Sequence, residues 1–460
     1  SESYRVRRPC RRIAGVLSWN LNMNLRWFAV FLLPVLGAVA PAAAQVPPIP
    51  PGWQMERVIL LARHDVRAPD QSPEELARFA ASPWPAWPVA AGNVTPRGIE
   101  LGRQMGQFYR LTYGGRGLIQ ADDCPAPGIV VIWVDLDKRT EYAALSTQGG
   151  PYLRCINPIL KHQTDLSKPD PLFHPSPSTT CPMDAAANRD AILARIGGDF
   201  SSVLREYAPQ LSKLQATLCP PGASPGGKAC GLAVEAPAIV PDPRGGVMMK
   251  GPIAIGSMAA ELFLTESAEG LPADQVAWGR LAGDAEILDV MKVHRLHGDL
   301  IEKTRQIARQ KGSNMLAQIV AALQDGHNFP GAPDITQPVR FGMLIGHDTN
   351  ILNVAGLLNL GWKLAGFQEN TAPPGSALAF ELLKEVRTGQ QFVRLAYFAQ
   401  TPEQMRQATR LDLNHLPDMV AVPLAACGGQ ETNNACPLQR FVEIAKAAID
   451  PGCVTIGKLR

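Results

Sequence analysis

The segment LARHDVRAP, residues 61–69, sets two arginines around one histidine directly after an apolar run. Residues 58–62, VILLA, form a short continuous apolar stretch, which is typical of a strand buried on both faces of an α/β sheet. Ligands of such sheets bind at the carboxyl ends of the strands. Arg63 and Arg67 can each grip phosphate oxygens with a planar guanidinium, and a neutral His64 can attack phosphorus. The segment therefore predicts an α/β fold with a phosphate-binding site around His64.

Two further strand-like runs end in polar residues that suit the same chemistry. Residues 339–345, VRFGMLI, lead into GHDTN, where His347 and Asp348 follow a glycine that permits close backbone approach. Asp348 has the carboxyl that is needed to protonate a leaving-group oxygen. Residues 128–134, GIVVIWV, lead into a loop that carries Arg139, a third candidate ligand of the substrate. Two histidines, three arginines and a carboxyl at strand ends form a complementary set for phosphoryl transfer.

Several other polar residues near these motifs have plainer interpretations. Asp135 and Asp137 precede Arg139, and we interpret them as solvated loop carboxylates, with ion pairs that orient Arg139 as the alternative. His294 and His297 lie three residues apart in a stretch with helical periodicity, and no third ligand is close in sequence. We interpret them as ordinary helix-face histidines, so the sequence predicts no metal site.

The N-terminus has the composition of a secretory leader. Arg26 precedes an apolar run over residues 27–39, and three alanines at residues 42–44 form a small-residue cleavage pattern. A retained membrane anchor is the alternative, but the apolar run is shorter than the ~20 residues of a spanning helix, which favours cleavage. Residues 1–44 are therefore predicted to be a leader with a signal peptide.

Removal of this leader changes the charge of the chain. The whole chain is formally +3, and residues 1–26 hold six arginines and one glutamate, so the mature chain is near 3 − 5 = −2. Nothing then favours nucleic-acid binding. We expect a small phosphorylated substrate as the partner, no stable membrane span after signal cleavage, and a periplasmic or secreted location. The oligomeric state stays open.

Eight cysteines lie beyond the leader, an even number that is typical of an exported, disulfide-bonded protein. Cys219 with Cys230, and Cys427 with Cys436, are close in sequence across glycine-containing turns, so we predict both pairs. The residues alone leave the pairing of the other four open. Zinc is the competing interpretation, and the absence of any CxxC pair argues against it.

The motifs also divide the chain. About 416 residues remain after cleavage, by subtraction of 44 from 460, which exceeds a typical single core. We predict an α/β catalytic domain from residues 45–154 and 335–460, interrupted by a mainly helical cap insertion, residues 155–334. Later strands are expected over residues 377–382 and 392–398, and cap helices over residues 253–265 and 300–323.

Together these motifs resemble the histidine acid phosphatases, in the bacterial branch that contains periplasmic phytases and glucose-1-phosphatases. The resemblance rests on RHDVRAP at residues 63–69, HD at residues 347–348, Arg139, WP at residues 87–88 and TPRG at residues 95–98. It implies a phosphoglycerate-mutase-like α/β domain with an inserted helical cap. It also implies catalysis through a phosphohistidine, with no cofactor and no metal.

The resemblance further assigns roles to single residues. It implies that His64 is the phosphorylated nucleophile and that Asp348 is the proton donor. The implied substrate ligands are Arg63, Arg67, Arg139 and His347. The implied disulfides that complete the set are Cys124–Cys155 and Cys181–Cys453.

Asp65 departs from the family pattern, which has glycine or asparagine at this position. A carboxylate beside the nucleophile would repel a polyanion such as phytate and could accept hydrogen bonds from sugar hydroxyls. We therefore predict that Asp65 sets specificity and that small phosphomonoesters such as glucose 1-phosphate are preferred, with phytate as a further candidate. Two alternatives stay open. One is a metal-dependent HD-type phosphohydrolase with ligands His64, Asp65, His347 and Asp348, and the other is a non-catalytic binder of phosphorylated ligands.

Overall fold

β1 is an inner strand of an eight-stranded mixed sheet with the order β10-β8-β7-β1-β6-β2-β3, and β9 pairs with β8. The strands are β1 Trp53–Arg63, β2 Val130–Val134, β3 Ile159–Lys161, β6 Phe341–Gly346, β7 Ala377–Glu385, β8 Gln391–Ala399, β9 Asp418–Ala421 and β10 Cys436–Pro437. β1, β6, β2 and β3 are parallel, and the other strands join by antiparallel pairing. The computed structural model describes residues 48–120, 123–149, 159–161, 167, 170–223, 230–329 and 337–455.

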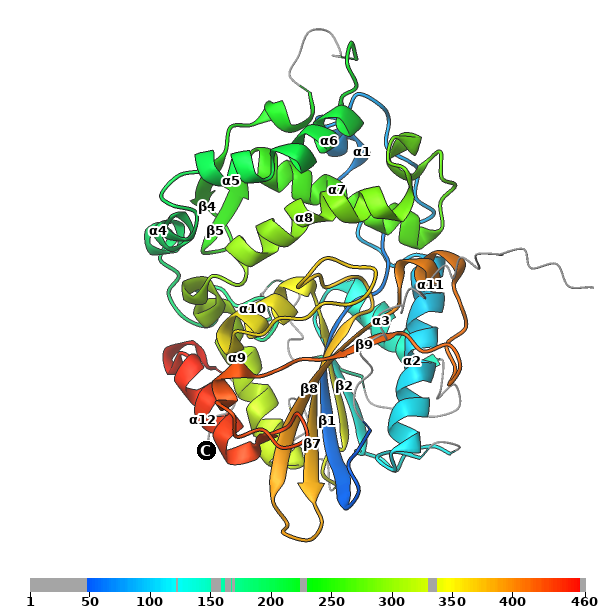
Figure 1. Ribbon diagram of the computed structural model, residues 1–460, viewed down its shortest axis with the longest axis vertical. Coiled ribbons are helices and arrows are strands. Elements are labelled where there is room, and N and C mark those ends of the chain that lie inside the picture. Colours follow the sequence, from blue (N-terminus) through cyan, green and yellow to red (C-terminus); the bar gives the residue numbers. More distant parts are fainter. Residues whose placement is uncertain are drawn as a thin grey trace, which may run out of the picture. The chain divides into compact units, whose positions relative to one another are not determined.

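Helices cover both faces of this sheet, as the apolar strands require. The covering helices are α2 Pro96–Gly115, α3 Lys138–Gly149, α9 Arg305–Gln324, α10 Asp348–Leu358 and α12 Leu438–Ala448. Figure 1 shows α2 on one side of the sheet, and α9 and α12 on the other. Ile59 and Leu61 join the core that contains α9, α10 and α12, whereas Val58, Leu60 and Ala62 join the core that contains α2 and α3. The predicted α/β fold is therefore confirmed.

A mainly helical cap lies between β3 and α9 in the sequence. Its main elements are α4 Ala185–Arg195, α5 Ser201–Glu206, α6 Ala208–Leu218, the hairpin β4 Ala238–Pro241 with β5 Val247–Lys250, α7 Pro252–Glu269 and α8 Gly283–Ile301. The shorter elements of the chain are α1 Pro73–Leu76, α11 Pro402–Gln407 and 3-10 turns at Gly231–Val234, Val276–Gly279, Gly326–Asn328, Ala425–Cys427 and Pro451–Cys453. α7 and α8 pack against each other and form the part of the cap nearest the ends of β1 and β6.

The packing differs from the predicted limits of the insertion, residues 155–334. β3 extends the main sheet, and α9 packs against α10, α12 and β1, so both belong with the α/β domain. The single helix predicted over residues 300–323 is also wrong, because α8 ends at Ile301 and α9 begins at Arg305. Tertiary contacts compensate for the break, since Asn353 Nδ2 on α10 donates to the backbone oxygen of Glu302 at 3.0 Å. No glycine or proline marks this break in the sequence.

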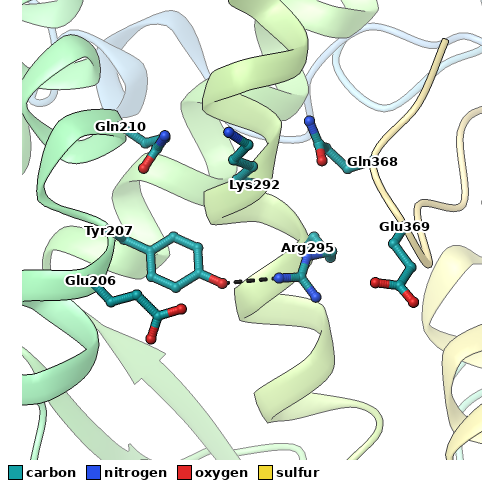
Figure 2. A pocket seen from close by; sticks show the side chains of 7 residues that line it. All are labelled: Glu206, Tyr207, Gln210, Lys292, Arg295, Gln368 and Glu369. Carbon is teal, nitrogen blue, oxygen red and sulfur yellow. Dashed lines mark hydrogen bonds between the residues drawn. The ribbon is translucent and has the colours of Figure 1, made fainter.

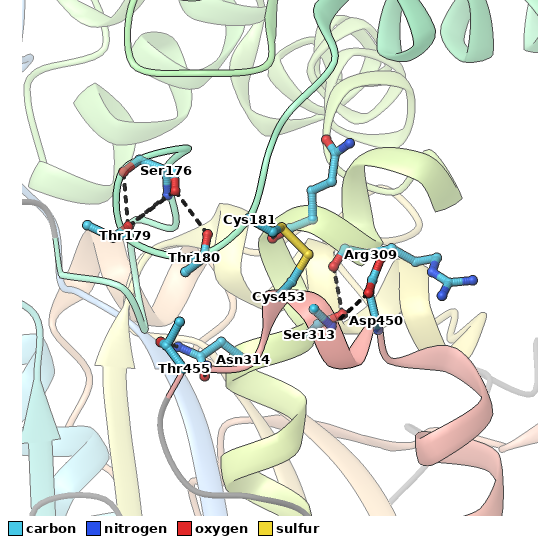
Figure 3. The surroundings of a disulfide bond; sticks show 12 residues. Ser176, Thr179, Thr180, Cys181, Arg309, Ser313, Asn314, Asp450, Cys453 and Thr455 are labelled. Carbon is cyan, nitrogen blue, oxygen red and sulfur yellow. Dashed lines mark hydrogen bonds between the residues drawn. A yellow bond between two sulfur atoms is a disulfide. The ribbon is translucent and has the colours of Figure 1, made fainter.

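Disulfides bond Cys219 to Cys230, Cys427 to Cys436 and Cys181 to Cys453, as predicted. The third bond joins the start of the cap to the C-terminal segment (Figure 3). Hydrogen bonds strengthen the same contact, because Ser313 Oγ on α9 accepts from the backbone of Asp450 at 2.8 Å. The C-terminal segment is therefore bonded covalently to the start of the cap and held on α9 by a polar contact.

Some predictions concern residues beyond the described ranges. The leader, residues 1–44, and Cys155 of the implied Cys124–Cys155 pair lie outside them, so both stay predictions. Within the described ranges, no helix combines the length and the apolar character needed to cross a bilayer.

Candidate active site

His64 lies where β1 ends, between β6 and the segment that leads into β7. Its backbone N–H donates to the oxygen of Gly346 at 3.0 Å, and its own oxygen accepts from the N–H of Gly375 at 3.0 Å. The ring nitrogen Nδ1 lies 2.8 Å from the backbone oxygen of Asp65. Because a carbonyl oxygen only accepts, Nδ1 carries the proton, which leaves the lone pair on Nε2 for attack.

The surroundings of His64 favour its neutral form. The side chain is buried, and burial lowers the pKa of His64 well below its ordinary value. The positive charges of Arg67 and Arg63 lower this pKa further. His64 is therefore a neutral imidazole in mildly acidic solution, as a nucleophile must be.

Three arginines surround this histidine, as the sequence predicts. Arg63 forms an ion pair with Glu261 of α7, and Arg67 pairs with Asp70 at 2.8 Å. The Nε atoms of Arg63 and Arg67 are buried and have no hydrogen-bond partner in the described part of the chain, so they are available to a bound anion. Arg139 Nε donates to His347 Nε2 at 3.0 Å, which joins the third arginine to the second histidine.

His347 and Asp348 lie where β6 ends and α10 begins. The rings of His64 and His347 meet edge to face, with centroids 5.4 Å apart. α10 starts at Asp348, so the positive end of the helix dipole adds to the attraction for an anion. Asp348 Oδ2 lies 3.7 Å from Arg63 Nη1, and its side chain is 21% exposed. Asp348 can therefore exchange protons with solvent and with a bound ester.

Our interpretation of Asp135 as a solvated loop carboxylate is wrong, whereas the side chain of Asp137 is 38% exposed and also ion-paired. Asp137 Oδ2 lies 2.5 Å from Arg139 Nη2 and 3.1 Å from His347 Nε2, which confirms the alternative for this residue. Asp135 is fully buried, and its Oδ2 lies 2.7 Å from Nε2 of His174. The hydrogen bond from His174 holds the pKa of Asp137 well below its usual range. Sequence analysis had no signal for His174, because it lies far from the motifs.

Asp65 does not face the substrate, and its predicted direct role in specificity is contradicted. Its carboxylate is buried, and Oδ2 accepts from Ser146 Oγ of α3 at 2.9 Å. The glycine at position 102 of α2 provides the space for this carboxylate, because a Cβ at Gly102 would collide with it. Burial raises the pKa of Asp65 to about 7. Asp65 is therefore neutral in acid and lies between α2 and α3, behind the nucleophile.

A pocket of about 270 Å³ opens in front of His64, and we call it the active-site pocket. Its lining includes Arg63, His64, Arg67, Asp70, Gln71, Ser257, Glu261, Thr265, His294, His297, Glu302, Asp348 and Thr349. Arg139 and His347 adjoin it behind His64. Our interpretation of His294 and His297 as ordinary helix-face histidines missed their position, because only the fold of the cap turns that face of α8 toward β1.

The opposite side of α8 borders a second pocket, of about 350 Å³. Figure 2 shows Tyr207 and Arg295 pointing toward each other, and Arg295 Nη2 donates to the hydroxyl at 3.0 Å. The other lining residues are Glu206, Gln210, Lys292, Gln368 and Glu369. Two cations and two carboxylates balance here, and the lining of this pocket includes no histidine that could act as a nucleophile.

Comparisons with known proteins agree with this geometry. A family model described as histidine phosphatase superfamily (branch 2) matches residues 269–397. Phytase AppA of Escherichia coli (strain K12) is 32% identical over 92% of this chain and 99% of its own length. A glucose-1-phosphatase of Salmonella typhimurium is 27% identical over 90% of this chain and 97% of its own.

Solved structures give the same result. The phytase of Hafnia alvei in complex with tartrate matches with a TM-score of 0.82 and 31% identity, over 88% of this chain and 100% of that one. The phytase of Citrobacter braakii matches with a TM-score of 0.80 and 30% identity, over 88% of this chain and 100% of that one. The strand-end histidines, their arginines and this full-length similarity place the chain in the histidine phosphatase superfamily, in the branch of the bacterial phytases and glucose-1-phosphatases.

Proposed function

We propose that this protein hydrolyses phosphomonoesters through a phosphohistidine at His64. The observation that carries the proposal is the position of a neutral, buried imidazole among Arg63, Arg67 and His347, with Asp348 at the edge of the same pocket. The cations offset the negative charge of a bound phosphoryl group, and Asp348 supplies a proton.

In the first step, His64 Nε2 attacks phosphorus and the bond from phosphorus to the ester oxygen breaks. Asp348 gives its proton to the departing oxygen, so an alcohol leaves and a phosphohistidine remains. Arg63, Arg67 and Arg139, with His347, stabilise the phosphoryl oxygens.

In the second step, Asp348 accepts a proton from water, and the water oxygen attacks phosphorus. The bond from phosphorus to nitrogen breaks, and inorganic phosphate leaves with His64 neutral again. Asp348 must therefore begin the cycle protonated while His64 is neutral. This requirement supports activity in acid, because burial and the arginines keep His64 neutral there.

The preferred substrates in this proposal are monophosphates with an uncharged leaving group that carries hydroxyls. Among the lining residues that the structure describes, Arg63 and Arg67 are the only Arg or Lys side chains, and both lie beside His64. The pocket lining also includes Glu261 and Glu302, which oppose further phosphates, and hydroxyl groups that can bind polyols. A volume of about 270 Å³ is just below the usual range for ligand pockets, which favours a sugar phosphate over a hexakisphosphate.

The proposed location is the periplasm or the exterior of the cell. Three disulfides in the described residues require an oxidising compartment, and the predicted signal peptide supplies the route.

The test is to trap the intermediate. Purified protein is mixed with a ³²P-labelled aryl phosphate and denatured in alkaline detergent, since phosphohistidine survives base. We expect labelled protein from the natural chain and none from His64→Ala, which should also lose at least about 10³-fold in turnover. Absence of label together with absence of phosphate release from any monoester would leave the non-catalytic binder.

The structure argues against the metal-dependent alternative, because one of its four proposed ligands does not point toward the others. It needs Asp65 beside His64, and the Asp65 carboxylate is bound to Ser146 instead. Turnover should therefore persist in EDTA, and a loss that is restored by added metal would favour this alternative over the phosphohistidine.

A further inference from the structure

Four metal-ligating side chains gather beside the phosphate ligands. Asp135 and Asp137 follow β2, His347 follows β6, and His174 comes from the loop before Cys181. One ligand atom from each lies within 4.8 Å of the others. His174 has no part in the proposed reaction and does not line the active-site pocket. The cluster is therefore a second feature of this end of the sheet.

The spacing of the atoms suits a bound ion. His174 Nε2 lies 2.7 Å from Asp135 Oδ2 and 3.8 Å from Asp137 Oδ2. His347 lies 3.6 Å from Asp135 Oδ2 through Nδ1, and 3.1 Å from Asp137 Oδ2 through Nε2. Ligand atoms at ~2.0–2.1 Å from a tetrahedral ion are about 3.3 Å apart, which lies within this range.

Two of these atoms are buried without a hydrogen bond. Asp135 Oδ2 and His347 Nδ1 have no hydrogen-bond partner in the described part of the chain, and their side chains are 0% and 9% exposed. Asp135 Oδ2 has a partner in the ion pair with His174 at 2.7 Å, so His347 Nδ1, which lies 3.6 Å from the same oxygen, is the atom that lacks a close partner. Buried polar atoms of this kind are rare in proteins and call for a partner, such as an ion.

We propose that Asp135, Asp137, His174 and His347 bind a borderline divalent cation such as Zn²⁺, and that this ion inhibits the enzyme. Two imidazoles with two carboxylates form a donor set that selects Zn²⁺, Co²⁺, Ni²⁺ or Cu²⁺ over the oxygen-seeking Mg²⁺ and Ca²⁺. The inhibition follows because the ion holds His347, which is then withdrawn from the phosphoryl group. That consequence rests on the proposed role of His347.

The charges of the cluster permit a cation here although they oppose one at His64. Asp135 and Asp137 contribute two negative charges, which match a divalent ion once it has displaced the proton through which His174 pairs with both carboxylates. Arg139 contacts Asp137, but it is shared with Asp70, which lies 3.1 Å from its Nη1. At His64, by contrast, the charges of Arg67 and Arg63 act on the imidazole, and they would repel a bound cation.

A second group, Glu261, His294 and Asp348, is the matched comparison. Its ligand atoms also lie within 4.8 Å of one another, but it offers three ligands instead of four. Glu261 pairs with Arg63 as Asp137 pairs with Arg139, so a cation competes with an arginine in both groups and the number of ligands separates them. If the ion binds the four-residue group, substitution of His174 weakens metal binding and substitution of His294 does not. If it binds the second group, the two effects are reversed.

The experiment measures binding and inhibition separately, at near-neutral pH in a non-chelating buffer. Co²⁺ is titrated and its visible absorption bands report coordination, and Zn²⁺ is titrated in an assay with an aryl phosphate. We expect one tightly bound ion in the natural protein. His174→Asn should weaken Co²⁺ binding and Zn²⁺ inhibition at least about tenfold, whereas His294→Asn should change both by less than about twofold. Each variant is compared with its own uninhibited rate.

Three outcomes overturn the proposal: no Co²⁺ bands in the natural protein, equal Zn²⁺ inhibition of His174→Asn, or loss of inhibition in His294→Asn instead. His174→Gln repeats the test if the asparagine variant fails to fold, which thermal denaturation shows. Co²⁺ binding in a protein that releases no phosphate would support the metal site and contradict the proposed function, so the two failures are distinguishable.

Discussion

The ring of His347 lies edge-on to the ring of His64, with an angle of 76° between their planes. Neighbouring parallel strands cause this contact, because Arg63 at the end of β1 is in register with Gly346 at the end of β6. His64 and His347, which are far apart in the sequence, therefore lie side by side because β1 and β6 are neighbouring strands. The same contact buries both rings, and burial lowers the pKa of His64 and of His347.

Arg67 should control the acid limit of activity. Arg67 is the charged group that most lowers the pKa of His64, after burial itself. A histidine with a lowered pKa stays neutral to lower pH, so Arg67→Gln should move the acid limb of kcat/KM upward by roughly one pH unit. Arg103→Gln on the surface of α2 is the control. A fall in kcat/KM with an unmoved acid limb would show that Arg67 acts on substrate alone.

Asp348 should matter most for poor leaving groups. A nitrophenolate departs with little need for a proton, whereas a sugar alkoxide requires one. Asp348→Asn should therefore reduce kcat for glucose 1-phosphate about 10²-fold more than kcat for p-nitrophenyl phosphate. The aryl ester serves as the internal control. Equal losses on both substrates would assign Asp348 to a step other than protonation of the leaving group.

An added cation in the pocket lining should shift specificity toward polyphosphates. Gln71 lines the active-site pocket. Gln71→Lys should raise the ratio of kcat/KM for phytate to kcat/KM for glucose 1-phosphate by about fivefold, which corresponds to roughly 1 kcal/mol of charge attraction. Gln71→Met has a similar length without charge and should leave the ratio in place. If both variants change the ratio equally, pocket shape rather than charge sets the preference.

Asp65 should make stability depend on pH. Burial raises its pKa to about 7 in the folded protein, from an ordinary value of 3.8. A raised folded-state pKa contributes stability that is fully present below about pH 3.8 and is lost as pH rises through 7. Asp65→Asn should thus be the more stable protein at pH 8 by up to about 4 kcal/mol, with no such gain in acid.

Urea unfolding of both proteins across pH measures this difference. The exposed Glu74→Gln is the control, because Glu74 lies on the surface in α1. Parallel stability curves for the natural chain and Asp65→Asn would contradict a neutral, buried carboxyl at this position.

Loss of the long-range disulfide should cost more than loss of a local one. Cys181 and Cys453 are separated by 272 residues, whereas Cys219 and Cys230 are separated by 11. A cross-link over a longer loop removes more entropy from the unfolded chain, so Cys181→Ser with Cys453→Ser should lower the free energy of unfolding by about 3–5 kcal/mol. Chemical denaturation of this double variant and of Cys219→Ser with Cys230→Ser compares the two. A larger loss in the local pair would contradict the loop-length argument.

The strands and their polar ends could be predicted from sequence because each depends on local information. An apolar run that stops at Arg63 or Gly346 marks both a buried strand and the edge where ligands bind. The direction of the Asp65 side chain could not be predicted in this way. It depends on Gly102 of α2 and Ser146 of α3, which reach Asp65 only after the helices pack.

The contributions of the cap were hidden for a related reason. Glu261 and His294 lie on different helices, and neither has a motif around it. They line the same pocket as His64 because α7 packs against α8 and the cap ends at α8. That end was misplaced because the break between Ile301 and Arg305 is stabilised by Asn353 of α10, a contact that no local pattern reports.

The bond between Cys181 and Cys453 also sets an order of events. Its second sulfur lies 272 residues after the first, so the bond cannot form until the chain has been synthesised as far as Cys453. Until then, the start of the cap lacks its covalent tie to the C-terminal segment, and Ser313 of α9 lacks the partner that Asp450 supplies. The cap is therefore complete in sequence well before the contact that fastens its first residues can be made.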